Sequence, residues 1–223
     1  MASESPSLYQ IEAQIRAALD APLPGAHAHL SLAPHPRRGW RPGHIPPGAN
    51  TAAGLILLYP LDDRPHILLT VRAGDLALHA GQVSFPGGRI EGDETIPQAA
   101  LREAAEEVGV DPDQVRVLGV LSTLYIPVSD FALHPVIGTT DRRPAFAAQM
   151  GEVGRILEVP LTDLLGSSPR QGASWRQDGQ FHVPYYELCG ERVWGATAMI
   201  LAELATVLRT RPMDPQAGSD VVR

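Results

Sequence analysis

Three glutamates in the stretch 87–110, GGRIEGDETIPQAALREAAEEVGV, have the type and spacing that a divalent cation requires. Glu103, Glu106 and Glu107 stand at positions i, i+3 and i+4, so a helix brings them to one face. Like charges on one face repel each other, and Arg102 offsets only part of that repulsion. Clustered carboxylate oxygens suit Mg²⁺ or Mn²⁺. The alternative is a solvated acidic face, which is the usual explanation of a run of glutamates.

The residues around the glutamates predict a glycine turn, an acidic loop and a short helix. Thr95 with Gln98 three residues later fits a capping box, and Gly109 can end the helix. The helix face away from the glutamates carries small side chains, so we expect it to pack closely on a sheet. The main-chain carbonyl near Gly87 or Gly88 offers a further metal ligand, because glycine lets the backbone approach closely.

The spacing of this whole stretch resembles the Nudix box of the Nudix hydrolases. The matching residues are Gly88, Glu94, Arg102, Glu103, Glu106, Glu107, Gly109 and Val110. Ala104 is smaller than the aliphatic residue that the family more often has there. The resemblance implies an α/β Nudix fold, with a mixed β-sheet sandwiched between α-helices. It also implies a Mg²⁺ or Mn²⁺ site held by Gly88, Glu103, Glu106 and Glu107, with Arg102 orienting Glu103 or Glu94, pairing with Glu106, or both.

The segment before the box resembles the signature of the coenzyme A diphosphatase branch of this superfamily. The segment is LLTVRAGDLALHAGQVSFPGG (68–88), and WGATAMIL (194–201) resembles the entry to that branch's C-terminal helix. One residue departs from the signature, because Ala77 stands where the branch has a second arginine able to bind a phosphate. His79 could substitute for it only in part.

The resemblance implies a metal-dependent diphosphatase that cleaves coenzyme A or a derivative into 3',5'-ADP and 4'-phosphopantetheine. Ala77 favours a second hypothesis, in which another nucleoside diphosphate derivative such as ADP-ribose, NADH or a nucleoside triphosphate is hydrolysed. A third hypothesis is a non-catalytic Nudix module that binds a nucleotide. The presence of all three box glutamates argues against that module.

Two glutamates are candidates for the general base. Glu103 can serve as ligand and base, and the family also allows a carboxylate from a later loop, where Glu152 is the candidate unless it is only a solvated loop residue. Arg102 completes the catalytic set. We predict that substrate contacts come from Arg72, Gln82, Ser84, Phe85 and Arg89. Phe85 could instead belong to the core, and Arg89 could face solvent.

Composition limits the other classes of function. The chain of 223 residues has 44% hydrophobic residues and no apolar run that could span a bilayer. Its first residues lack the basic and apolar regions of a secretory signal, so we expect none there. Its one cysteine, Cys189, excludes an internal disulfide framework and suits the cytoplasm. All 18 basic residues are arginine, which excludes a Walker-A lysine and a Schiff-base lysine. A net charge of −7 argues against a nucleic-acid partner.

We expect three parts along the chain. Residues 1–50 hold a helix over 7–20 and a Pro-rich segment that is either an ordered wrap or a flexible connector, and they could form a homodimer contact. Residues 51–211 form the Nudix hydrolase domain, and residues 212–223 a flexible tail. Within the domain we predict a hairpin over 53–60 and 66–72, strands over 114–122, 131–139 and 153–160, a helical turn over 161–165, a hairpin over 173–194 and a closing helix over 195–210.

Overall fold

A computed structural model of the chain describes residues 6–36, 39–73, 81–176 and 179–209. The described helices are α1 (Leu8–Leu19), α2 (Gly25–Leu30), α3 (Ile96–Val108), α4 (Leu161–Gly166) and α5 (Gly195–Arg209), with a short 3-10 turn at Pro112–Gln114. The main sheet holds β1 (Asn50–Leu61), β2 (Arg64–Arg72), β3 (Val83–Ser84), β4 (Gly87–Arg89), β5 (Arg116–Val120), β6 (Leu124–Ile126), β7 (Phe131–Thr139) and β8 (Val153–Pro160). A second sheet holds β9 (Arg170–Arg176), β10 (Gly179–Leu188) and β11 (Glu191–Trp194).

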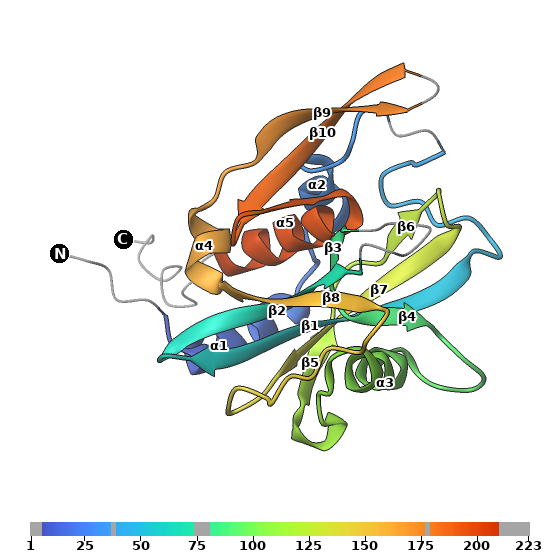
Figure 1. Ribbon diagram of the computed structural model, residues 1–223. Helices are drawn as coiled ribbons and strands as arrows, with labels where there is room; N and C mark the ends of the chain where they lie inside the picture. Colours follow the sequence, from blue (N-terminus) through green and yellow to red (C-terminus); the bar gives the residue numbers. More distant parts are fainter. Residues whose placement is uncertain (1–5, 37–38, 74–80, 177–178, 210–223) are drawn as a thin grey trace, which may run out of the picture.

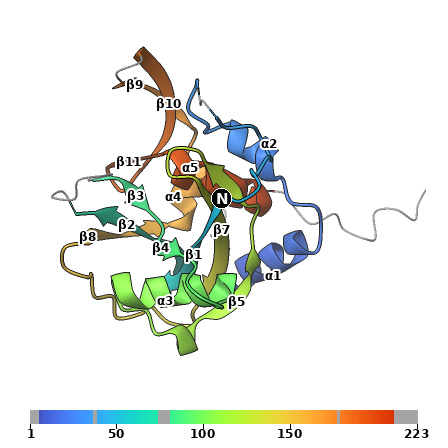
Figure 2. The same cartoon turned by 90° about the vertical axis from the view of Figure 1, so that its right-hand side faces the viewer.

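The main sheet is mixed and lies between helices, as the α/β prediction requires (Figure 1). Its strands follow the order β3-β2-β1-β7-β5, while β4 also pairs with β1, β6 with β7 and β8 with β2. The pairing of β1 with β7 is parallel, whereas the other pairings of this sheet are antiparallel. Helix α3 covers one face, and α1 and α5 cover the other (Figure 2).

Alternating side chains of β1 supply both halves of the core. Leu55, Leu57 and Tyr59 point toward α3 and its buried alanines, whereas Ile56 and Leu58 point toward α5. All five are fully buried, which explains why the sequence of this strand is apolar without an alternating pattern. The small alanines of α3 let the helix axis approach the sheet, as expected from the sequence.

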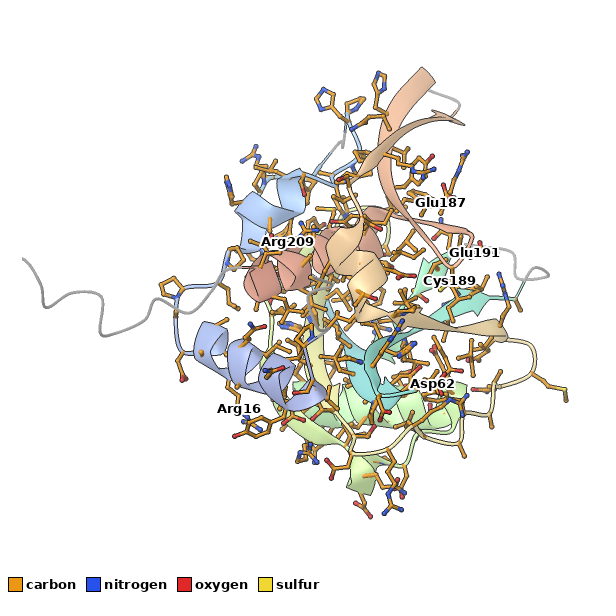
Figure 3. All side chains as sticks on the ribbon, turned by 90° about the vertical axis from the view of Figure 1, so that its left-hand side faces the viewer. Arg16, Asp62, Glu187, Cys189, Glu191 and Arg209 are labelled. Carbon is orange, nitrogen blue, oxygen red and sulfur yellow. The ribbon has the colours of Figure 1, made fainter. Side chains whose placement is uncertain are left out.

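The predicted hairpin of β1 and β2 is confirmed, and its turn has a clear physical cause. Asp62 and Asp63 both have positive φ, at 49° and 58°, which is the conformation of a tight two-residue turn (Asp62 is labelled in Figure 3). Aspartate tolerates this region better than most residues that have a side chain. The turn therefore fixes the register in which Leu58 faces Ile67.

The segment between α1 and β1 is an ordered wrap in its described part, and it includes the unexpected short helix α2. His35 pairs with His182 of β10 through two backbone hydrogen bonds of 2.9 and 2.8 Å. Gly39 then lies against Pro127. Leu32, which follows α2 in the sequence, packs in the core beneath α5. The wrap therefore connects the three-stranded sheet to the turn between β6 and β7.

The later elements follow the predicted order. Strands β5, β7 and β8, the helical turn α4 and the closing helix α5 lie where the sequence places them. The hairpin predicted over 173–194 is part of the three-stranded sheet, and Cys189 and Gly190 form its second turn with positive φ (Cys189 is labelled in Figure 3). Asp178, between β9 and β10, lies outside the described residues. In the described part of the chain, no helix is both long and apolar enough to cross a membrane.

Candidate active site

The glutamate helix lies at a fork in the main sheet. Strand β1 pairs with β4 through residues 52–54 and with β2 through residues 58–61, so β4 and β2 diverge from the same strand. The glycine turn follows β3 and forms the start of β4. A Cβ added at Gly87 would lie 2.6 Å from the Cα of Gly54, and only glycine allows so close an approach.

Gly88 has no room for a side chain because the carboxylate of Glu103 occupies that space. A Cβ at Gly88 would lie 2.6 Å from Oε2 of Glu103. Helix α3 is capped at its start by Thr95, whose N–H donates to Gln98 Oε1 at 2.8 Å, and at its end by Gly109 in the left-handed conformation. These local signals set the phase of the helix and bring Glu103 against the glycine turn.

Arg102 holds the acidic groups in place. Its Nε and one terminal nitrogen donate to both oxygens of Glu94, at 3.1 and 2.8 Å. Its other terminal nitrogen donates to Glu103 at 2.8 Å and to Glu106 at 3.3 Å. The side chain also donates to the carbonyl of Arg89 at 3.0 Å. Arg102 therefore makes both contacts that the sequence left open, one with Glu94 and Glu103 and one with Glu106.

Glu107 lies in a partly buried, negatively charged environment. Burial raises the pKa of Glu107 to about 7, and the charges of Glu103 and Glu152 also raise it, whereas the Gly87 N–H and the charge of Arg72 lower it. Burial likewise raises the pKa of Glu103, despite the opposing effect of Arg102. The ionised forms of Glu103 and Glu107 are therefore disfavoured, because the nearby arginines do not fully offset burial and the neighbouring negative charges.

This excess of carboxylates over guanidinium groups fits a divalent cation. Oxygen ligands from carboxylates are those that Mg²⁺ and Mn²⁺ prefer. Within the described residues, no three acidic, histidine or cysteine side chains lie close enough together to form a ready-made metal site. Glu106 points outward, with its side chain 56% exposed, and shares a nitrogen of Arg102 with Glu103. A cation held by all three glutamates would require Glu106 to rotate toward the other two.

A loop far along the chain is attached to the C-terminal end of α3. The Ala147 N–H donates to the Val108 carbonyl at 2.9 Å, and the Gln149 N–H to the Glu107 carbonyl at 2.8 Å. The carbonyl of Glu152 then accepts from the Ala73 N–H at 2.9 Å. These bonds bring Glu152 near Glu107 and the end of β2. Sequence reasoning proposed Glu152 but missed Gln149, whose role is carried by its backbone and leaves no side-chain signal.

The predicted substrate contacts lie in different surroundings. Arg72 ends β2 near Glu107, and its Nε is buried without a hydrogen-bond partner. Its backbone N–H donates to the Gln82 carbonyl at 3.0 Å, and Ser84 lies one strand away, with its hydroxyl 3.2 Å from that of Thr70. Arg89 is exposed and donates to Asn50.

Phe85 does not fit the predicted role in substrate binding. Its side chain is 7% exposed and packs in the core beneath α5. The structure therefore favours the core role that the sequence left open. Ala77 and His79, the residues that bear on the coenzyme A signature, lie outside the described residues.

Comparison with known proteins agrees with this geometry. Residues 49–148 match the NUDIX domain. The chain is 39% identical over 150 residues to an uncharacterized Nudix hydrolase, NudL, of Pectobacterium atrosepticum, a match that covers 66% of this chain and 78% of that protein. The NudL of Klebsiella pneumoniae is 37% identical over 172 residues, with 70% and 83% covered. The chain belongs to the Nudix hydrolase family.

The fold of this Nudix hydrolase is also found in a solved relative. The crystal structure of RenU, a Nudix hydrolase from M. smegmatis, superposes with a TM-score of 0.53 at 20% identity and covers 74% of this chain and 89% of that one. The predicted Nudix fold is confirmed, and so is the enzyme class, a hydrolase of phosphoric anhydrides. Nudix hydrolases generally use divalent metal ions. The names of these relatives do not specify a substrate.

Proposed function

We propose that this Nudix hydrolase cleaves the diphosphate bond of coenzyme A or its derivatives, giving 3',5'-ADP and 4'-phosphopantetheine. The observation that carries the proposal is a buried nitrogen at the end of β2, Nε of Arg72, which has no hydrogen-bond partner. Arg72 comes from the segment that resembles the coenzyme A diphosphatase signature, and its positive charge lowers the pKa of Glu107 of the glutamate helix. The buried, unpaired Nε of Arg72 is a donor that a phosphate oxygen of the substrate can satisfy.

The proposed metal ligands are Glu103, Glu106, Glu107 and the main-chain carbonyl of Gly88. A Mg²⁺ or Mn²⁺ ion bound there would neutralise the diphosphate oxygens and lower the pKa of a bound water. Arg102 acts as a positioning residue, because its bidentate contact with Glu94 fixes the guanidinium that holds Glu103. Because the carboxylate of Glu103 lies against Gly88, the proposal puts the reacting bond beside the glycine turn.

Two carboxylates remain candidates for the proton acceptor. Glu103 is partly buried and hydrogen-bonded to Arg102, which favours a fixed ligand over a mobile base. Glu152 is exposed on a loop that the backbone holds beside Glu107, so it can accept a proton from water and release it to solvent. We therefore favour Glu152 as the general base. Arg72, Gln82, Ser84 and Arg89 are the proposed substrate contacts.

The test is a substrate panel. Purified protein is incubated with Mn²⁺ and coenzyme A, ADP-ribose, NADH or a nucleoside triphosphate, and the products are separated by chromatography. We expect 3',5'-ADP and 4'-phosphopantetheine from coenzyme A, at a kcat/KM above those of the other compounds. Intact coenzyme A beside cleavage of another compound would overturn the substrate and support the alternative that Ala77 favours. Lack of cleavage of every compound would support a nucleotide-binding module.

A further inference from the structure

The loop over 141–152, between β7 and β8, ends in Glu152 and has little apolar contact of its own. Most of its residues are exposed. Within this loop, which the structure describes throughout, Phe146 is the one side chain that packs against an apolar cluster of the core. Because so little apolar surface is buried, burial alone does not hold the loop in one place. The position of Glu152 therefore depends on the other contacts that fasten the loop.

The C-terminal end of α3 supplies the first of these contacts. The last carbonyls of a helix have no partner within the helix. Two of them, those of Glu107 and Val108, accept from the N–H groups of Gln149 and Ala147 at 2.8 and 2.9 Å. Both bonds are made by the backbone, so they form only when the loop follows the right path. The loop thus ends the helix that carries the proposed metal ligands.

A polar cluster near the start of the loop fixes that path. Arg143 donates through Nε and a terminal nitrogen to the two oxygens of Glu158 on β8, at 2.6 and 2.7 Å. The hydroxyl of Tyr59, a fully buried residue of β1, donates to the same carboxylate at 3.0 Å. The hydrogen bond from Arg143 lowers the pKa of Glu158, whereas burial raises the pKa of Tyr59. Glu158 is therefore an ionised acceptor that joins the loop to two strands of the sheet.

Phe146 connects this cluster to the bonds with α3. Its ring meets that of Tyr59 edge to face, with centroids 5.2 Å apart and an interplanar angle of 65°. The guanidinium carbon of Arg143 lies 5.2 Å from the centre of the Phe146 ring, within the range of a cation–π contact. Ala147, the next residue, is one of the two whose N–H groups reach the helix. The cluster therefore fixes the segment that bonds to α3.

At the end of the loop, the backbone of Glu152 is held on both sides. Its N–H donates to the Gln149 carbonyl at 3.3 Å, and its carbonyl accepts from the Ala73 N–H at 2.9 Å. The charge of Glu152 lies close enough to Glu107 to raise the pKa of Glu107. A continuous set of contacts thus runs from the cluster on β1 and β8 to the edge of the candidate active site.

We propose that Arg143 is a positioning residue that sets the place of Glu152 beside the glutamate helix. It acts through the path of the loop, and its own place is fixed by Glu158 and Tyr59. The inference rests on the proposed function in one respect, the role of Glu152 as the proton acceptor. A general base must lie within hydrogen-bond reach of the proton that it removes. Loosening the loop should therefore slow the chemical step and leave substrate binding intact.

The kinetic test is a double-mutant cycle with the compound of the substrate panel that is cleaved fastest. Arg143→Ala should lower kcat about 10-fold or more, within the contribution of a general base, and change KM less than about twofold. In a Glu152→Gln protein, Arg143→Ala should lower kcat no further, because no base is left to position. An equal fall of kcat in that protein would overturn the inference, since Arg143 would then act by another route.

Hydrogen exchange tests the anchor without any reaction. Arg143 is 41% exposed, so we expect Arg143→Ala to fold. The amides of Ala147 and Gln149 should then exchange about 10-fold faster or more, while the amides of β1 and β7 keep their wild-type rates. Unchanged exchange at the two loop amides would overturn the inference.

The matched control is Arg170→Ala, which removes an arginine that pairs with Glu187 on the three-stranded sheet. It should leave kcat and the exchange of the loop amides unchanged. Wild-type kcat in Glu152→Gln would reject the proposed base and, with it, the catalytic role of Arg143. Unchanged exchange beside an impaired Glu152→Gln protein would reject the anchor alone, so the two failures are distinguishable.

Discussion

At the scale of single residues, the site depends on one contact that only glycine allows. The carboxylate of Glu103 faces the glycine turn and occupies the space that a side chain at Gly88 would need. Its position is then fixed from the other side by Arg102, which is itself held by Glu94. The chemistry of the carboxylates follows from the sequence, whereas their position follows from this close packing.

Gly88→Ala should therefore inactivate the enzyme while the fold persists. The new Cβ would lie 2.6 Å from Oε2 of Glu103 and displace that carboxylate. We expect kcat/KM to fall about 100-fold or more, because displacing a metal-site carboxylate weakens an interaction of several kcal/mol. The control is Gly166→Ala in α4, where an added Cβ meets nothing within 4 Å. Equal activity of the two variants would contradict the proposed role of Glu103.

At the scale of elements, a buried carboxylate fastens the wrap to the C-terminal helix. Glu203 of α5 is 0% exposed and accepts three hydrogen bonds, from the Gly25 N–H at 3.1 Å, the Ser122 N–H at 3.3 Å and His29 Nε2 at 2.9 Å. A buried carboxylate is tolerated only with such partners. Glu203 thus joins α2, the loop before β6 and α5.

Replacing Glu203 should destabilise the whole protein. Glu203→Ala leaves His29 and two backbone N–H groups buried without an acceptor, so we expect the free energy of unfolding to fall by about 3–5 kcal/mol in urea titrations. Glu187→Ala is the control (Glu187 is labelled in Figure 3), because Glu187 pairs with Arg170 on the surface and the expected loss is below about 1 kcal/mol. Similar losses for both variants would show that Glu203 does not fasten the wrap.

At the scale of the whole molecule, the proposed metal site predicts a link between metal binding and stability. The pKa of Glu107 is raised to about 7 in the folded protein from an ordinary value of 4.5. Between these values the folded state binds more protons than the unfolded state, so the contribution of Glu107 to stability is lost as the pH rises. Metal binding requires the deprotonated carboxylate and therefore has the opposite dependence on pH.

We expect this dependence to appear when metal is removed. In EDTA, raising the pH from 5 to 7.5 should lower the free energy of unfolding of the wild-type protein relative to Glu107→Gln by on the order of 2 kcal/mol. Added Mn²⁺ should stabilise the wild-type protein more at pH 7.5 than at pH 5. Thermal unfolding monitored by circular dichroism measures both effects. Stabilisation by Mn²⁺ that is equal at the two pH values would refute the assignment of Glu107 as a ligand.

Two predictions at this scale stay as predictions. The division at residues 50 and 211 and the homodimer contact through the N-terminal segment have no test in the structure of one chain. The described part of that segment does contribute to the core, because Ile11 and Ile15 of α1 are buried beneath α5. Its outer side leaves Tyr9 exposed and open to a partner.

The sequence by itself determined the parts of the protein that depend on neighbours along the chain. The caps at Thr95 and Gly109, the hairpin turn at Asp62 and Asp63, and the shared face of the three glutamates all arise from contacts within a few residues. Short-range hydrogen bonds and backbone preferences suffice for such features. The shared face of the glutamates predicted a divalent-cation site, and the resemblance of the stretch 87–110 to the Nudix box implied the fold.

Only the tertiary structure decided which distant residues join the site. Arg72 and Glu152 both lie near enough to Glu107 to shift its pKa. Arg72 is there because β2 and β4 diverge from β1, and Glu152 because its loop is hydrogen-bonded to the end of α3. Phe85 turns into the core. Such outcomes depend on strand pairing and on which face of the sheet a residue occupies. A shift of one residue in register would move such side chains to the other face of the sheet, and no tight turn fixes the register of strands that are distant in the sequence.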